Sequence, residues 1–241
     1  MGMLNGKVAL VTGASRGIGR AIAVALASEG ATLEITARNE SSLEETAKLC
    51  EQAGAASVTS RAIDLSSSEG TETLCSTLIE GHGRVDVLVN NAGVYVSGHA
   101  LDGDPDDWER GLAVNVAAPM RLTRRLSPGM VDAGGGAIIN IGSVAAIEGM
   151  TDAGAYAATK HALRGWSLSC YQKLRLAGIK VVLINPAFVD TEMTAGVSGA
   201  DRSRMISPGD IADAAMLAVR TSPACCPEEI TLRLTRSPFD A

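Results

Sequence analysis

The sequence predicts an α/β protein with a doubly wound parallel sheet of about seven strands and helices on both faces. Short β-branched or apolar runs alternate with longer segments of helical period along the whole chain. Some of these runs, such as 85–89 and 179–184, are apolar on both faces, which is typical of strands covered by helices on two sides. The predicted strands are 8–11, 32–37, 58–63, 85–90, 137–141, 180–185 and 230–234.

The predicted helices lie between these strands and carry local start and stop signals. Asn39, Asp104-Pro105 and Ser207-Pro208 provide capping side chains, followed in the last two cases by a first-turn proline. Glycines follow four of the helices, where a left-handed residue is favoured: Gly30, Gly54, Gly81 and Gly178. The helices are predicted over 17–29, 40–53, 67–80, 106–128, 154–177 and 208–220.

The composition favours one acidic, reduced domain. The 241 residues carry a formal net charge of −6 without any basic run, so we expect no nucleic-acid partner. The longest apolar stretches, such as 21–27, are too short to span a membrane, and the five cysteines have no metal or disulfide spacing. Because the first residues show no signal-peptide core, we expect a cytoplasmic protein. No linker divides 1–241, and the glycine-containing segment 191–207 is predicted to be a mobile substrate loop.

The turn after the first predicted strand has the composition of a dinucleotide-binding loop. Its residues run straight into a helix: Gly13, Ala14, Ser15, Arg16, Gly17, Ile18 and Gly19. Glycines let the backbone approach a pyrophosphate, and a helix N-terminus offers free N–H groups and the positive end of its dipole. The spacing G-x-x-x-G-x-G, with no Gly-Lys-Ser/Thr after it, is not that of a P-loop. We therefore expect a Rossmann-like fold with the cofactor phosphates at this turn.

The same segment also matches G-x-S-x-G, the nucleophile elbow of α/β-hydrolases, with Ser15 as the nucleophile. That chemistry requires an acid and then a histidine downstream of the serine. The histidines are His82, His99 and His161, and none lies near the chain end where the base would be expected. A hydrolase also leaves Gly19 without a function, so this alternative is disfavoured.

The end of the second strand indicates which dinucleotide is bound. An acidic residue at this position bonds the ribose 2′-hydroxyl of NAD, whereas arginine accommodates the 2′-phosphate of NADP. Here Ala37 supplies no carboxylate and Arg38 follows it, while Arg16 in the glycine turn is a second candidate for the phosphate. NADP is therefore the predicted cofactor.

A Tyr-x-x-x-Lys pair, which alone is weak evidence, completes a set of motifs that indicates the function. Tyr156 and Lys160 lie on one helical face, and Ser143 precedes Tyr156 by 13 residues. Together with the glycine turn, Asn115 and Asn90-Asn91-Ala92-Gly93, these motifs resemble in order and spacing the short-chain dehydrogenase/reductase family in its single-domain form. The resemblance covers essentially the whole chain. Its layout is most similar to 3-oxoacyl-acyl-carrier-protein reductases and general ketone reductases.

The resemblance implies hydride transfer between a nicotinamide and a ketone or secondary alcohol. Tyr156 is then the general acid, or the base in the oxidative direction. Lys160 holds the nicotinamide ribose, and its ammonium is expected to favour the Tyr156 phenolate. Ser143 hydrogen-bonds the substrate oxygen, and Asn115 kinks its helix and holds a water of the proton relay.

Further cofactor contacts are implied by the same resemblance. Asp64 matches the residue that bonds the adenine, and Val189 and Thr191 match contacts to the carboxamide. The remaining implied cofactor positions are Leu65, Asn91, Ala92, Gly93 and Pro186. The chain departs from the family in having Pro186-Ala187 instead of Pro-Gly, so the turn beside the nicotinamide is expected to differ slightly. It also lacks the final Asp-Gly-Gly turn, which puts the usual packing of the tail in doubt.

The sequence specifies the substrate and the oligomeric state less closely than the cofactor. The segments 94–101, 144–152 and 188–206 mix apolar side chains with few charges, which indicates a hydrophobic carbonyl or acyl-thioester substrate. Small residues along 154–177 permit close helix approach and predict a homotetramer, with a dimer as the alternative. A regulatory or scaffold protein that binds the dinucleotide without turnover is the alternative function. It is disfavoured because binding alone requires neither the serine nor the tyrosine.

Overall fold

The computed structural model describes residues 2–239, which form one seven-stranded sheet in which every pair of neighbouring strands is parallel. The strand order is β3-β2-β1-β4-β5-β6-β7, so the predicted doubly wound fold is confirmed. The strands are β1 (Val8–Thr12), β2 (Thr32–Ala37), β3 (Ser57–Ala62), β4 (Val87–Asn90), β5 (Gly136–Ile141), β6 (Ile179–Pro186) and β7 (Glu229–Leu232).

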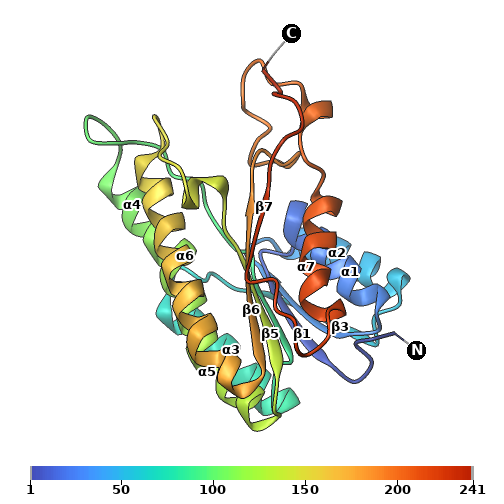
Figure 1. The fold of residues 1–241 in the computed structure, drawn as a ribbon. Coiled ribbons are helices and arrows are strands. Elements are labelled where there is room, and N and C mark those ends of the chain that lie inside the picture. Colours follow the sequence, from blue (N-terminus) through green and yellow to red (C-terminus); the bar gives the residue numbers. More distant parts are fainter. Residues whose placement is uncertain (1, 240–241) are drawn as a thin grey trace.

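Helices cover both faces of the sheet, as Figure 1 shows, with α1, α2 and α7 on one side and α3, α4, α5 and α6 on the other. The α-helices are α1 (Gly17–Ser28), α2 (Glu40–Ala53), α3 (Ser68–His82), α4 (Pro105–Leu112), α5 (Ala118–Asp132), α6 (Gly154–Leu174) and α7 (Pro208–Arg220). None of the helices in the described part of the chain has both the length and the apolar character needed to cross a membrane.

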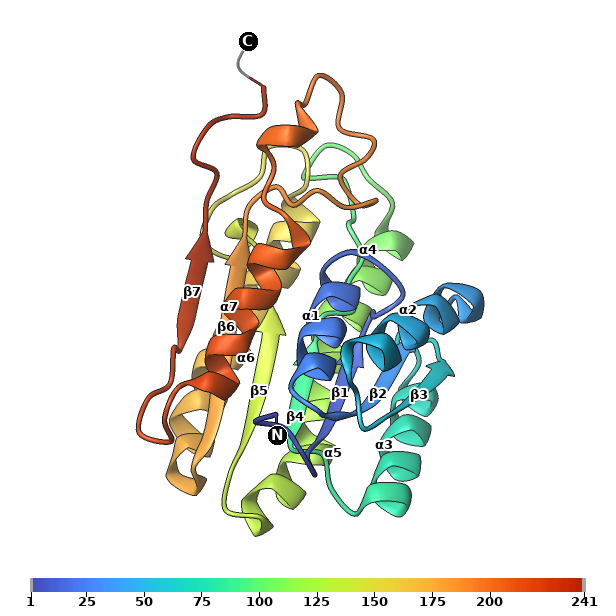
Figure 2. The same ribbon diagram turned by 90° about the vertical axis from the view of Figure 1, so that its right-hand side faces the viewer.

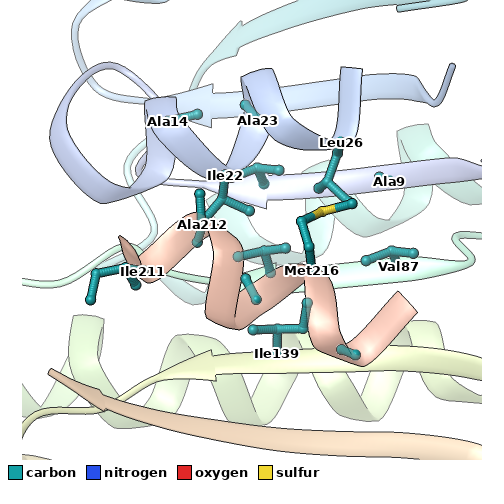
Figure 3. Close-up of a cluster of buried hydrophobic side chains, with 14 of the residues drawn as sticks. Ala9, Ala14, Ile22, Ala23, Leu26, Val87, Ile139, Ile211, Ala212 and Met216 are labelled. Atoms are coloured by element: carbon teal, nitrogen blue, oxygen red, sulfur yellow. The ribbon is translucent and has the colours of Figure 1, made fainter. Parts of the chain in front are cut away.

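Buried apolar side chains attach each helical layer to the sheet. Ile22 of α1 and Met216 of α7 point into one cluster with Val87 and Ile139 of the central strands (Figure 3), and all four are almost completely buried. Leu10 of β1 faces the opposite layer and joins the cluster around α3 and α5. Burying one such side chain contributes about 1.5–3 kcal/mol. Because successive side chains of β1 point to opposite faces of the sheet, this strand packs against helices on both sides.

The helix predicted over 106–128 is not continuous. The chain forms α4, then the π-helical segment Ala113–Ala117, and then α5, which extends to Asp132. Asn115 lies in the middle of the π-helical segment, where its side chain accepts a bond from Val94 N and donates one to Val94 O, each at 2.9 Å. The irregular turn thus lies where the family resemblance implied a kink.

One helix end was predicted wrongly. Gly81 lies inside α3, which continues to His82, and the positive φ of 75° belongs to Gly83. The Gly83 N–H bonds to Ile79 O at 2.8 Å, which closes the last turn two residues later than predicted. The other three predicted glycines have the positive φ expected of them.

The direction of the winding changes between β1 and β4. The chain moves outward from β1 to β3 and then returns to place β4 on the other side of β1, as Figure 2 shows at the centre of the sheet. In an open parallel sheet, a crevice forms at the carboxyl ends of the strands where the winding reverses.

Candidate active site

A cavity of about 400 Å³ lies at the carboxyl ends of β1, β2, β3 and β4. Segments from the glycine turn, the second strand and the fourth strand contribute to it, as the sequence predicted. The predicted cofactor-binding residues that line it are Gly13, Ser15, Arg16, Gly17, Ile18, Arg38, Asp64, Leu65, Asn91, Ala92, Gly93 and Thr191. Residues far apart in the sequence therefore meet around one volume.

Gly19 contributes to this cavity without lining it. A Cβ at this position would lie 2.3 Å from Gly13 O and 2.4 Å from Asn91 Nδ2. The absent side chain lets α1 begin against the turn, while Asn91 Nδ2 donates to the oxygens of Thr12 and Gly13 at 2.9 and 3.0 Å. Gly19 and Asn91 thus fix the shape of the phosphate turn from behind.

Cationic and acidic groups share the rim of the cavity. Arg38 follows the end of β2 and lines the cavity. Arg16 Nε lies 3.8 Å from Glu192 Oε2, and the side chains of Arg16 and Glu192 are both more than half exposed. The Ser66 N–H is the main cause that lowers the pKa of Asp64; burial opposes this effect, and the Arg38 charge adds to it. Two guanidinium groups beside glycine-turn N–H groups suit the phosphates of a dinucleotide.

Sequence reasoning missed three polar residues of this lining, Asn39, Ser42 and Glu192. Asn39 was recognised only as a helix cap, and its side chain does accept from Ser42 N at 2.9 Å. Its position directly after Arg38 was the available signal. Glu192 lay in the segment 188–206, of which only Val189 and Thr191 were assigned to the cofactor.

The predicted catalytic side chains do not line this cavity; they adjoin it at the ends of β4 and β5. Asn115 Nδ2 donates to Thr159 Oγ1 at 3.0 Å, which connects the π-helical segment to α6. A Cβ on Gly93, which lines the cavity, would lie 3.3 Å from Asn115 Oδ1 and 3.8 Å from Lys160 Nζ. The cavity and the catalytic group are therefore in direct contact.

Ser143 caps the short 3-10 turn Val144–Ala146 and lies two residues after Ile141, the last residue of β5. Its hydroxyl accepts from Ala145 N at 3.1 Å, and its own N–H donates to Asn185 Oδ1 at 3.3 Å. These two bonds fix the turn that presents the hydroxyl toward Tyr156.

Burial acts on the pKa of Tyr156 in the opposite direction to the effect expected of Lys160. Burial raises the pKa of its phenol to about 12; a hydrogen bond with the Ser143 side chain lowers it, and Tyr95 raises it further. The expected lowering by Lys160 does not appear among the causes. Burial also lowers the pKa of Lys160 to about 8, and its Nζ donates to Ile141 O at 2.9 Å, 5.6 Å from the centroid of the Tyr156 ring. The protein's own groups thus favour a neutral phenol.

Tyr95 is a further residue that sequence reasoning missed. Its ring centroid lies 5.2 Å from that of Tyr156 at an interplanar angle of 45°, and half of the residue is exposed. It belongs to the segment 94–101, which was assigned to the substrate for its apolar character. An aromatic ring two residues after Gly93 was the signal.

Pro186 and Val189 lie on the other side of the catalytic group. Pro186 ends β6, and Ala187 N bonds to Leu232 O at 2.9 Å. Ala187 has no positive φ, so this turn does not require the glycine that it lacks. Val189 is buried in the core and pairs with Ile206, which places its side chain away from the cavity.

The C-terminal tail packs on the predicted substrate loop. Asp201 N donates to Pro238 O at 2.7 Å, and the rings of Phe188 and Phe239 meet edge to face at 5.5 Å. The tail thus makes contacts of its own although the Asp-Gly-Gly turn is missing. Among residues 2–239, no group of three or more His, Cys, Asp or Glu side chains is arranged to hold a metal ion.

The fold is a doubly wound sheet with a glycine turn suited to a dinucleotide, and a Ser, Tyr and Lys group adjoins that turn. Together these features define an oxidoreductase that uses a nicotinamide dinucleotide. The family model described as short chain dehydrogenase matches residues 7–201. The chain belongs to this short-chain dehydrogenase/reductase family. It is 34% identical over 230 residues to an uncharacterised oxidoreductase from Staphylococcus saprophyticus, covering 95% of this chain and 98% of the relative.

Solved structures agree with this assignment. A metagenomic short-chain oxidoreductase in complex with NADP is 38% identical, with a TM-score of 0.85 over 97% of this chain and 100% of its own. The L-sorbose reductase of Gluconobacter frateurii, complexed with NADPH and L-sorbose, is 30% identical, with a TM-score of 0.85 over 96% of this chain and 97% of its own.

Proposed function

We propose that this enzyme is an NADPH-dependent reductase of apolar ketones, 3-oxoacyl thioesters included, which also catalyses the reverse oxidation of the secondary alcohol. The observation that carries the proposal is the contact between the dinucleotide cavity and the catalytic group: a Cβ on Gly93, which lines the cavity, would lie 3.8 Å from Lys160 Nζ, and Tyr156 is hydrogen-bonded to Ser143. A neutral phenol is the form required of a proton donor in carbonyl reduction.

The preference for NADPH rests on Arg38 and Arg16. Both guanidinium groups line the cavity, and Ala37 at the end of β2 offers no carboxylate to a ribose hydroxyl. A 2′-phosphate adds charge that Arg38 can bind by charge-assisted hydrogen bonds. Glycine-turn N–H groups at the start of α1 hold the pyrophosphate.

When bound, the nicotinamide supplies the hydride that the carbonyl carbon accepts. Ser143 donates a hydrogen bond to the carbonyl oxygen, and Tyr156 gives that oxygen its proton, which yields the alcohol. Lys160 holds the ribose and, being charged, stabilises the phenolate that Tyr156 leaves. The phenolate regains its proton through Lys160, and Asn115, bonded to Val94 and Thr159, orients a water that replaces the proton on Lys160.

The apolar character of the substrate is inferred from the side chains around Tyr156. Tyr95 stands half exposed against it, and Ile147 and Met193 are also exposed on the adjoining segments. Exposed apolar groups beside a catalytic group indicate the surface that a ligand covers. L-sorbose, which the Gluconobacter enzyme reduces, is far more polar than the ligand these residues suit.

Several properties complete the proposal. The enzyme is cytoplasmic and a homotetramer, formed through the exposed small residues of α6, which include Ala158, Ala162 and Gly165. The segment 191–207, whose helical content is the short 3-10 turn Arg202–Arg204, moves when substrate binds.

The direct test follows the absorbance of NADPH and NADH with a panel of ketones, sugars and 3-oxoacyl thioesters. We expect kcat/KM to be higher with NADPH and highest for apolar carbonyl compounds. Binding of NADPH without turnover of any carbonyl or alcohol would support the alternative, a dinucleotide-binding regulatory protein.

A further inference from the structure

An arginine–glutamate pair connects the helix of Tyr156 to the edge of the sheet. Arg164 of α6 donates to Glu229 of β7 twice, from Nε to Oε1 at 2.7 Å and from Nη2 to Oε2 at 3.0 Å. Such a bidentate pair fixes orientation as well as distance. Arg164 follows Tyr156 by eight residues and Lys160 by four, so the three side chains share one face of α6.

Glu229 also holds the residue that fixes Ser143. Asn185 Nδ2 donates to Glu229 Oε1 at 2.8 Å, and Asn185 Oδ1 accepts from Ser143 N at 3.3 Å. Asn185 is completely buried, and a Cβ on Gly142 would lie 2.2 Å from its Oδ1. The close approach leaves Asn185 little freedom to find another acceptor.

We propose that Arg164 and Glu229 are positioning residues that set Ser143 against Tyr156, an inference that rests on the proposed function. The connection runs from α6 through Glu229 and Asn185 to the turn of Ser143, and α6 itself carries Tyr156. The pair thus joins the proton donor and the group that orients the substrate oxygen into one frame.

The partial exposure of Arg164 and Glu229 distinguishes a positioning role from simple stabilisation of the fold. The side chains of Arg164 and Glu229 are 38% and 23% exposed, and ion pairs near the surface contribute little to stability. Placement of reacting groups has a far larger effect, since a displacement of about 1 Å can cost on the order of 100-fold in rate.

A matched pair elsewhere provides the control. Arg125 of α5 donates to both carboxylate oxygens of Glu72 in α3, at 2.7 and 3.0 Å, on elements that do not carry the catalytic group. We expect Glu229→Ala to lower kcat about tenfold and to leave the affinity for NADPH within twofold. Glu72→Ala leaves kcat and the affinity for NADPH unchanged. Glu229→Gln keeps most of the wild-type kcat, because the amide oxygen of glutamine still accepts from Asn185.

Combination with Ser143→Ala tests whether the pair acts through Ser143. We expect Glu229→Ala to lower kcat less than twofold in a Ser143→Ala background, because the group that it positions is already gone. Losses that multiply in the double variant would overturn the proposal, as would an equal loss in Glu72→Ala.

A crystal structure of Glu229→Ala gives a readout that does not depend on any substrate. The expected result is a Ser143 turn displaced relative to Tyr156, with the glycine turn unchanged. A Ser143 turn that stays in place overturns the positioning role, even if the proposed reductase activity is established. If instead the turn moves and no carbonyl is reduced by the wild type, the proposed function fails and the positioning geometry stands.

Discussion

Lys160 Nζ donates a 2.9 Å hydrogen bond to the backbone oxygen of Ile141. Ile141 is the last residue of β5, and Ser143 follows two residues later. Because Tyr156 lies one helical turn before Lys160, this bond fixes the proposed proton donor to the strand from which Ser143 extends. The ammonium therefore has a structural function in addition to its proposed contact with the ribose.

The buried ammonium makes stability depend on pH in a defined direction. The pKa of Lys160 is about 8 in the folded chain and 10.5 ordinarily, so between these values the unfolded chain binds more protons. The contribution of Lys160 to stability then rises with pH across this window. We expect the free energy of unfolding of the wild type to gain on the order of 3 kcal/mol relative to Lys160→Met between pH 8 and 10.5. Urea titrations of both proteins between pH 8 and 10.5 measure this gain. Parallel curves of unfolding free energy against pH for the two proteins would contradict the prediction.

Replacement of Tyr156 by Phe deletes only the phenolic hydroxyl and keeps the ring against Tyr95. General acid catalysis contributes about 10²–10⁴-fold, so we expect kcat to fall by at least 100-fold while the Kd for NADPH changes little. Steady-state kinetics and fluorescence titration with NADPH check the two parts. Tyr171→Phe, on the same helix, is the control, and half of the wild-type turnover in Tyr156→Phe would remove this residue from the mechanism.

Arg38→Asp removes the cation at the end of β2 and places a carboxylate beside the ribose. We expect NADPH binding to weaken by about 1.5–3 kcal/mol, the value of a hydrogen bond to a charged group, while NADH binding is retained. The ratio of kcat/KM for the two cofactors measures the change. Lys48→Asp alters net charge equally outside the cavity and serves as control. A wild type that uses NADH as well as NADPH would refute the assignment of Arg38.

Assembly through α6 has a simple mutational test. Ala162 is exposed on this helix, and a charge there would oppose burial against a second copy. We expect light scattering at micromolar concentration to give the mass of a tetramer for the wild type and a lower mass for Ala162→Glu. Ala133→Glu, beyond the end of α5, is the control. A monomeric wild type contradicts the prediction.

Local patterns in the sequence predicted the strands, most helix ends and the lining of the cavity, because alternation and glycine spacing are local properties. The exact end of α3 was missed because Gly81 and Gly83 are two residues apart. Either could end the helix by its sequence, and the hydrogen bonds of the fold decide that Gly83 does. The effect of burial on the pKa of Tyr156 was not foreseen, because burial depends on residues brought together by folding. The link between Arg164 and Glu229 spans 65 residues and leaves no periodic signal.

The lining of the cavity comes from six separate parts of the chain, the last of which is 191–193. During synthesis the binding site is therefore incomplete until most of the sheet has been made, and partly folded chains lack it. A ligand that binds only the finished fold stabilises that fold by mass action, by about 2.7 kcal/mol at a hundred times its Kd. A dinucleotide that binds only the finished fold therefore also favours the folded chain over the unfolded forms that proteases attack.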